Sequence, residues 1–105
     1  MNAAGGLHST AADLHRFLDQ QLRPDATSLS AAITTTHAPP PEGLPLGWQS
    51  HPRQRSVLWH SGATGGYRAF IAIRPSTQTA VVILLNSFTI RGADLVGSGL
   101  LQQLD

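Results

Sequence analysis

The stretch VLWHSGATGGYRAFIAIRPSTQTAVVILLN, residues 57–86, predicts three consecutive β-strands and decides the fold. Residues 57–60 form a short apolar run, residues 67–73 carry apolar side chains on both faces, and residues 79–85 are continuously apolar. A continuous apolar run is typical of a strand that is buried on both faces. Glycines separate the first two strands, and the turn before the third opens with Pro75. Short turns of this kind make the strands antiparallel neighbours.

Upstream of these strands, the spacing predicts a helix from about Ala11 to Leu22. Thr10 and Asp13 stand at capping-box spacing, so the threonine hydroxyl can accept a hydrogen bond from the first turn. Arg23-Pro24 ends the helix. A single apolar stripe follows from the helical period and comprises Leu14, Phe17, Leu18 and Leu22.

The segment between this helix and the strands is less regular. Ser28 is expected to cap a short second helix that runs through Ile33. Residues 38–45 contain four prolines and a glycine, which favours an extended surface loop within one domain. Residues 46–49 are expected to form a short strand, and residues 51–56 a polar turn.

The last segment predicts a helix from Gly92 or Ala93 to Leu104. Gly97 and Gly99 each cost about 1 kcal/mol in a helix interior, so we expect them to allow close packing on the sheet. The expected apolar face comprises Leu95, Val96, Leu100, Leu101 and Leu104. The fold class is therefore α+β: an antiparallel sheet of three to four strands flanked by an N-terminal and a C-terminal helix, in a single domain spanning residues 1–105.

The composition excludes several classes of function. The chain has 105 residues, a formal net charge of +1 and few charged side chains, which argues against a nucleic-acid partner. No apolar stretch approaches the roughly 20 residues of a membrane span, and we expect no secretory signal at the N-terminus. Cysteine is absent, so the sequence does not indicate a compartment. All seven basic residues are arginine, so this chain cannot complete a mechanism that needs lysine.

Neither a metal site nor a cofactor is expected from the motifs. If His8 and His15 were both helical, they would lie about 10 Å apart along the axis, too far to share one ion. We therefore expect ordinary surface or loop positions for His8, His15, His37 and His51. Residues 97–99 lack the preceding strand of a dinucleotide loop, and residues 62–66 lack the lysine of a phosphate loop.

His60-Ser61-Gly62 has two interpretations. The first is a polar hairpin loop, which the spacing alone favours by about two to one. The second is a strand edge that offers backbone N–H groups to a developing oxyanion, with the His and Ser side chains beside it. The second interpretation depends on three coincident features: the end of a strand, the glycines that follow and the aromatic residue that opens the next strand.

Four stretches, taken in order, resemble the C-terminal part of the serine β-lactamase and penicillin-binding-protein-like family. They are AGGLHSTAADLHRF at residues 4–17, LGW at 46–48, WHSGATGGY at 59–67 and the apolar strand that ends at Asn86. The resemblance covers nearly the whole chain and is nearest to class C type β-lactamases and the related esterases and D-amino-acid peptidases.

The resemblance implies a role for each residue of the third catalytic motif, which is Lys-Thr-Gly or His-Ser/Thr-Gly in that family. His60 and Ser61 would bind the substrate carboxylate or support proton transfer, and the Ala63 amide would supply half of an oxyanion hole. Gly62 and Thr64 would contact a small-molecule or peptide substrate. The histidine at position 60 points toward the esterase-like or peptidase-like members.

The chain departs from the family at the nucleophile. The Ser-x-x-Lys motif requires a lysine, and Tyr67, the only tyrosine, leaves no Tyr-x-Asn element. We therefore expect the C-terminal segment of a serine hydrolase that is inactive alone. The alternatives are a non-enzymatic peptide-binding module and a gene remnant that folds without activity. We also expect self-association through exposed strand edges.

Overall fold

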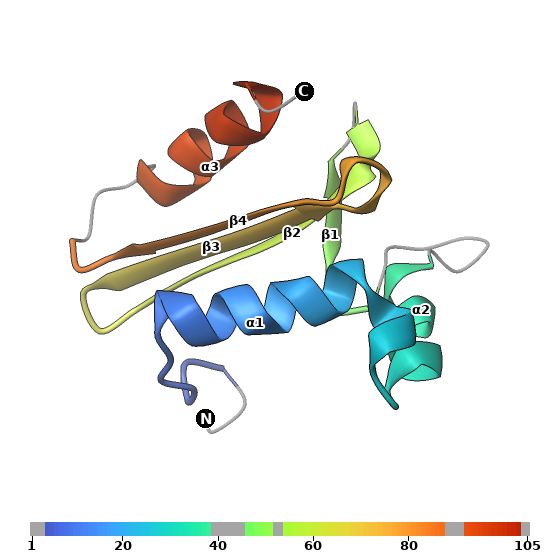
Figure 1. Ribbon diagram of the computed structural model, residues 1–105. Helices are drawn as coiled ribbons and strands as arrows, with labels where there is room; N and C mark the ends of the chain where they lie inside the picture. The colour runs from blue at the N-terminus through green and yellow to red at the C-terminus, as the bar shows by residue number, and fades with distance from the viewer. Residues whose placement is uncertain (1–3, 39–45, 52–53, 88–91, 104–105) are drawn as a thin grey trace.

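The computed structural model describes residues 4–38, 46–51, 54–87 and 92–103. In this part of the chain, three α-helices accompany one antiparallel sheet whose strand order is β1-β2-β3-β4. Helix α1 lies on one face of the sheet and helix α3 on the other (Figure 1). The α+β prediction is confirmed. The elements are α1 (Ala11–Leu22), α2 (Ser30–His37), β1 (Gln49–His51), β2 (Gln54–Thr64), β3 (Tyr67–Arg74), β4 (Thr79–Leu85) and α3 (Gly92–Gln103).

A two-residue hairpin joins β2 to β3. Thr64 pairs with Tyr67 across it, and the residues between them, Gly65 and Gly66, have φ angles of 57° and 84°. Glycine adopts positive φ at little cost, and two such residues match the right-handed twist of the flanking strands. The predicted turn glycines at these two positions are confirmed, whereas Gly62 lies within β2.

The sheet separates two apolar cores, because side chains alternate between its faces. The core beneath α3 contains Val57, Phe70, Ala72 and Val81. The core on the α1 side contains Leu18, Trp48, Leu58 and Ile73. The prediction that both faces of the sheet are covered is therefore confirmed.

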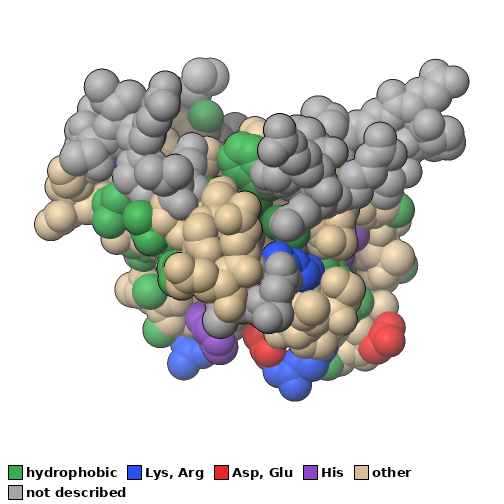
Figure 2. Space-filling view, turned by 90° about the horizontal axis from the view of Figure 1, so that it is seen from above, with side chains coloured by type: hydrophobic (Ala, Val, Ile, Leu, Met, Phe, Trp, Pro, Cys, Tyr) green, Lys and Arg blue, Asp and Glu red, His purple; other side chains and the backbone are tan. Residues whose placement is uncertain are grey.

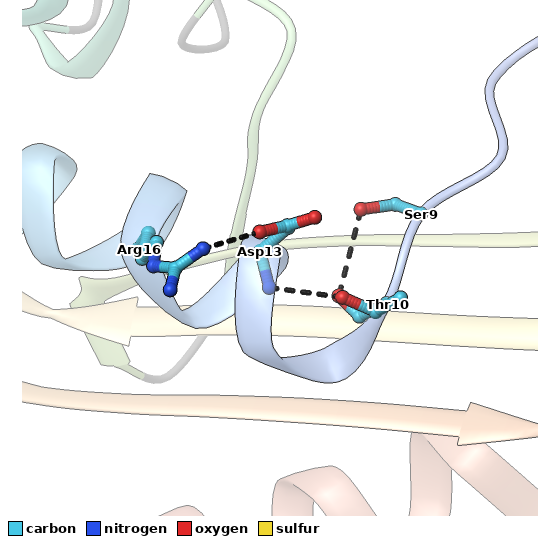
Figure 3. A network of polar contacts seen from close by, with 4 residues as sticks. All are labelled: Ser9, Thr10, Asp13 and Arg16. Atoms are coloured by element: carbon cyan, nitrogen blue, oxygen red, sulfur yellow. Dashed lines mark hydrogen bonds and ion pairs between the residues drawn. The ribbon is translucent and has the colours of Figure 1, made fainter.

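Helix α1 begins and ends where the sequence predicts. The Thr10 hydroxyl accepts a hydrogen bond of 3.2 Å from the Asp13 amide, and the Asp13 carboxylate pairs with Arg16 at 2.7 Å (Figure 3). The negative charge of Asp13 is favoured near the positive end of the helix. One member of the expected apolar stripe differs, because Phe17 is 43% exposed. Its ring instead stacks on Trp48, with centroids 6.5 Å apart.

The second helix does not follow the prediction. It begins at Ser30, has no side-chain cap, and continues past Ile33 through a run of three threonines to His37. The Thr35 hydroxyl donates to the Ala31 carbonyl and the Thr36 hydroxyl donates to the Ile33 carbonyl, both at 2.8 Å. These bonds satisfy the hydroxyls within the helix, which explains why the run is tolerated.

The first two strands also differ from the prediction. The expected strand at residues 46–49 is displaced to Gln49–His51, because residue Gly47 adopts a turn with a φ of 74°. The expected polar turn at 51–56 is wrong, since β2 already begins at Gln54. Pairing of β2 with both neighbours overrides the polar composition of this segment. Residues 39–45 of the proline-rich loop expected at 38–45 lie outside the described residues.

Helix α3 is confirmed between Gly92 and Gln103, but its apolar face is only partly as predicted. Val96 and Leu100 are exposed rather than buried. Gly97 is buried against the sheet, whereas Gly99 faces open space. Leu104 and the side chains of Leu95 and Leu101 lie outside the described residues. None of the helices in the described ranges is long and apolar enough to cross a membrane.

Candidate functional site at the end of strand β2

The predicted site residues lie on the outer half of β2. β1 covers the inner half, where Gln49 pairs with Trp59 and Ser50 with Leu58. From His60 to Thr64 the strand continues to pair with β3, but it has no partner on its other side among the described residues. The backbone groups of this segment that point away from β3 are therefore available to a bound molecule.

Alternation along the strand divides the predicted site residues between the two faces. His60, Gly62 and Thr64 share the face of Leu58 on the α1 side, and Ser61 and Ala63 share the face of Val57 on the α3 side. The structure therefore brings the five residues into one strand segment but places the His60 and Ser61 side chains on opposite faces. His60 is exposed and Ser61 is partly buried.

The backbone amides of Ser61 and Ala63 point to the same edge of β2, because alternate residues of a strand direct their N–H and C=O groups to the same neighbour. Ala63 pairs with Arg68 of β3, and Ser61 pairs with Phe70. Thr64 and Tyr67 flank the two-residue turn and form the hydrogen-bonded pair that closes such a hairpin, so the amide of the preceding residue, Ala63, points away from β3. An amide in this position has the chemistry that an oxyanion hole needs, which is a preorganised N–H donor.

Gly62 has no structural reason to be glycine. Its φ angle is not among the positive values, and a Cβ atom built on it would meet no heavy atom within 4 Å. Glycine within a strand is less favourable than alanine by roughly 0.5–1 kcal/mol. The surface above Gly62 is therefore open, and folding does not require a glycine at this position.

A loop at the N-terminus closes one end of this segment. Gly5 has a φ angle of 73°, and a Cβ atom built on it would lie 3.3 Å from the Thr64 Oγ1. The sequence gives no indication of this contact, because it joins residues that are 59 positions apart. Gly5 therefore belongs to the surroundings of the candidate site.

On the α3 side, aromatic rings support the same segment. Trp59 stacks on Phe70 with ring centroids 6.0 Å apart and an interplanar angle of 22°. Its Nε1 is buried without a hydrogen-bond partner in the described structure. Arg68 shares this face and is the only Lys, Arg, Asp or Glu between residues 56 and 73. The sequence interpretation gave no site role to Trp59 or Arg68.

His37 corrects the expectation of an ordinary surface histidine. Its Nε2 donates to the Gln21 Oε1 at 2.9 Å, and its ring lies edge-on to Trp48 at 5.9 Å. Burial lowers the pKa of His37 from its ordinary value of 6.5, because desolvation disfavours the charged ring. His37 therefore joins α2 to α1 and to the core, a structural role in the described part of the chain.

The described residues hold no cluster of three or more His, Cys, Asp or Glu side chains suited to a metal ion. The face seen from the α3 side carries blue and red side chains near one another along one margin, and the coloured part of that face has no basic patch (Figure 2). The arrangement therefore offers a strand edge, a histidine, a serine and an open glycine, which suit recognition of a carbonyl compound.

A family model described as Beta-lactamase matches residues 1–101 of the chain. The match includes α1, the whole sheet and nearly all of α3. No curated protein matches the chain.

Proposed function

The chain belongs to the Beta-lactamase family, and we propose that its β2 forms the third-motif side of a serine hydrolase active site. That site would cleave amides or esters through an acyl-enzyme. His60 and Ser61 would bind the substrate carboxylate or support proton transfer, and the Ala63 amide would donate to the oxyanion. The histidine at position 60 favours an esterase or peptidase over a dedicated β-lactamase.

The observation that carries this proposal is the open surface at Gly62. Neither the backbone nor the packing requires glycine there, and a glycine within a strand costs stability. A substrate that lies along the uncovered edge of β2 gives the residue a purpose, since a side chain at this position would occupy the same space. Thr64, next to Gly5, would mark the limit of the substrate site at the end of the strand.

His60 and Ser61 lie on opposite faces of β2, so each can have a separate role in the proposed site. A carbonyl compound at the edge of β2 can be reached from above and below, so the two side chains need not share a face. His60 is exposed on the α1 side and is available for proton transfer. Ser61 lies on the α3 side, in the same face as Arg68, whose positive charge favours a substrate carboxylate nearby.

The nucleophile must come from outside these 105 residues. A Ser-x-x-Lys motif needs a lysine, and the sequence has none. We therefore infer that the chain is the C-terminal segment of a larger hydrolase and has no turnover alone. The DNA upstream of the Met1 codon tests this inference, because an in-frame Ser-x-x-Lys is expected there. An in-frame stop codon with no such motif upstream would contradict it.

Kinetics of that longer product provide the second test. His60→Ala should lower kcat/KM for the preferred ester or amide by about 10²–10⁴, the usual contribution of a general acid or base. His8→Ala is the matched control, since His8 is exposed and lies outside β2. Equal activity of the two variants would exclude a catalytic role for His60.

A second candidate function is a non-enzymatic peptide-binding module. It is favoured by the unpaired side of β2 from His60 to Thr64, which can accept an extended peptide as a further strand. Amide-shift titration with peptidoglycan-type peptides tests it. Shifts at residues 59–63 are expected, and their absence would count against this function.

A further inference from the structure

Four side chains form a square on the α3 face of strands β2 and β3. Trp59 pairs with Ala72 across the two strands. Ser61, two residues further along the same face, pairs with Phe70. Trp59 and Phe70 are therefore diagonal neighbours, and such neighbours are within reach of aromatic side chains. Their rings stack with centroids 6.0 Å apart, so they fill the square between the two small side chains, Ser61 and Ala72.

The stacked rings are themselves firmly held. Within the described sheet, Trp59 is the last residue of β2 that has a strand partner on both sides, because it pairs with Gln49 of β1 as well as with β3. Phe70 is 2% exposed, and Gly97 of α3 packs against its ring. The pair of rings therefore forms a fixed surface beside the segment of β2 that begins at His60 and has a partner on one side.

Trp59 acts in this packing through its ring and not through its indole N–H. The Trp59 Nε1 is buried without a hydrogen-bond partner, and a buried donor without an acceptor is unfavourable. A phenylalanine ring would fill much of the same space without this penalty. The contribution of Trp59 to its neighbours is therefore the apolar surface of the ring, and Trp59→Phe keeps that surface without losing a hydrogen bond.

We propose that Trp59 is a positioning residue, which acts with Phe70 to hold the Ser61 side chain toward the uncovered edge of β2. A serine side chain has three staggered rotamers. The stacked rings lie on the β3 side of Ser61, so they obstruct the rotamers that turn the hydroxyl toward β3. The rotamer that remains directs the hydroxyl to the edge where the substrate is proposed to lie.

The value of this positioning lies in preorganisation. The inference rests on the proposed function, in which Ser61 binds the substrate carboxylate. A hydroxyl that is already directed at the carboxylate pays little to become ordered when the substrate binds, so more of the hydrogen bond contributes to affinity. Trp59 supports this affinity through Ser61, without touching the substrate.

The rotamer of Ser61 can be measured in the 105-residue chain by NMR, from the three-bond couplings between its Hα and Hβ protons. We expect the couplings of one dominant rotamer in the unchanged chain and in Trp59→Phe, and averaged couplings in Trp59→Leu. Phe17→Leu is the matched control, because it removes an aromatic stack with Trp48 on the α1 side and should leave the Ser61 couplings unchanged. Averaged couplings in the unchanged chain, or equal couplings in the unchanged chain and Trp59→Leu, would overturn the proposal.

Kinetics of the longer hydrolase separate this inference from the proposed function. Two esters that differ only in a carboxylate near the scissile bond are compared. Trp59→Leu should raise KM for the carboxylate ester by about tenfold, through a weakened hydrogen bond to a charged group, and leave KM for the neutral ester unchanged. Trp59→Phe should restore the lower KM.

Ser61→Ala distinguishes the two ways in which this test can fail. If Ser61→Ala keeps the preference for the carboxylate ester, the proposed role of Ser61 is wrong and the inference is wrong with it. If Ser61→Ala loses the preference but Trp59→Leu changes KM for both esters equally, Trp59 has only a structural role and the proposed function stands.

Discussion

Gly97 of α3 lies directly against the ring of Phe70 in β3: a Cβ atom built on Gly97 would be 2.3 Å from two ring carbons. Phe70 is 2% exposed and stacks on Trp59, so its ring has little room to move. The helix therefore approaches the sheet as closely as a backbone without a side chain allows.

Gly97→Ala should destabilise the chain relative to Gly99→Ala. Alanine improves helix propensity at both positions by about 1 kcal/mol, so the difference between the variants isolates the collision with Phe70. That difference in the free energy of unfolding should be about 1–3 kcal/mol, the usual cost of overpacking. Urea unfolding measures it, and equal stability of the two variants would show that α3 can move away from the sheet.

Gly62→Ala should impair catalysis in the longer hydrolase without lowering the stability of the fold. A Cβ atom at this position meets nothing within 4 Å, so the free energy of unfolding should stay equal or rise by roughly 0.5–1 kcal/mol. In the longer hydrolase, the same substitution should raise KM or lower kcat, because the methyl group lies where substrate is proposed to pass. A loss of stability would mean that folding, rather than substrate, selects this glycine.

Thr10→Ala should weaken the start of α1. It removes the acceptor of the Asp13 amide, and the loss of such a cap costs about 0.5–2 kcal/mol. Ser9→Ala is the control, since the Ser9 hydroxyl makes only a 3.5 Å contact with the Thr10 carbonyl (Figure 3). In thermal unfolding, Thr10→Ala should have a lower Tm than Ser9→Ala. The reverse order would show that the Thr10 cap does not stabilise the helix.

The stability of the chain should fall in acid through His37. Burial lowers the pKa of His37 below 6.5 in the folded state, so the unfolded chain binds its proton first as the pH falls. The contribution of His37 is therefore complete above about pH 6.5 and is lost as the pH falls to the lowered folded pKa. His37→Gln keeps a polar group beside Gln21 without this titration. The stability difference between the two chains should shrink between about pH 8 and pH 5, and a constant difference would contradict this prediction.

Strong periodicity made most of the fold predictable. The period of 3.6 located α1 to its last residue, and the runs at 67–73 and 79–85 located β3 and β4. The sequence was misleading where the pattern is polar. The outer half of β2 contains His, Ser, Gly and Thr, which alone favour a loop, yet five consecutive pairs with β3, from His60 to Thr64, hold it as a strand.

The motif of the candidate site could be predicted from the sequence, but the positions of its side chains and their distant neighbours could not. The His60-Ser61-Gly62 step could be recognised in the sequence, whereas its separation onto two faces depends on β2 continuing to Thr64. The approach of Gly5 to Thr64 and the contact of His37 with Gln21 join distant parts of the chain. Such contacts have no local sequence pattern, so only the folded chain reveals them.

The most direct test of the proposed function is hydrolysis of a chromogenic short-chain ester and a chromogenic β-lactam by the purified 105-residue chain. The chain lacks the lysine of the nucleophile motif, so we expect rates equal to those of buffer alone for the unchanged chain, His60→Ala and His8→Ala. Hydrolysis that survives purification, disappears in His60→Ala and persists in His8→Ala would contradict the account, because the chain would then contain a complete active site.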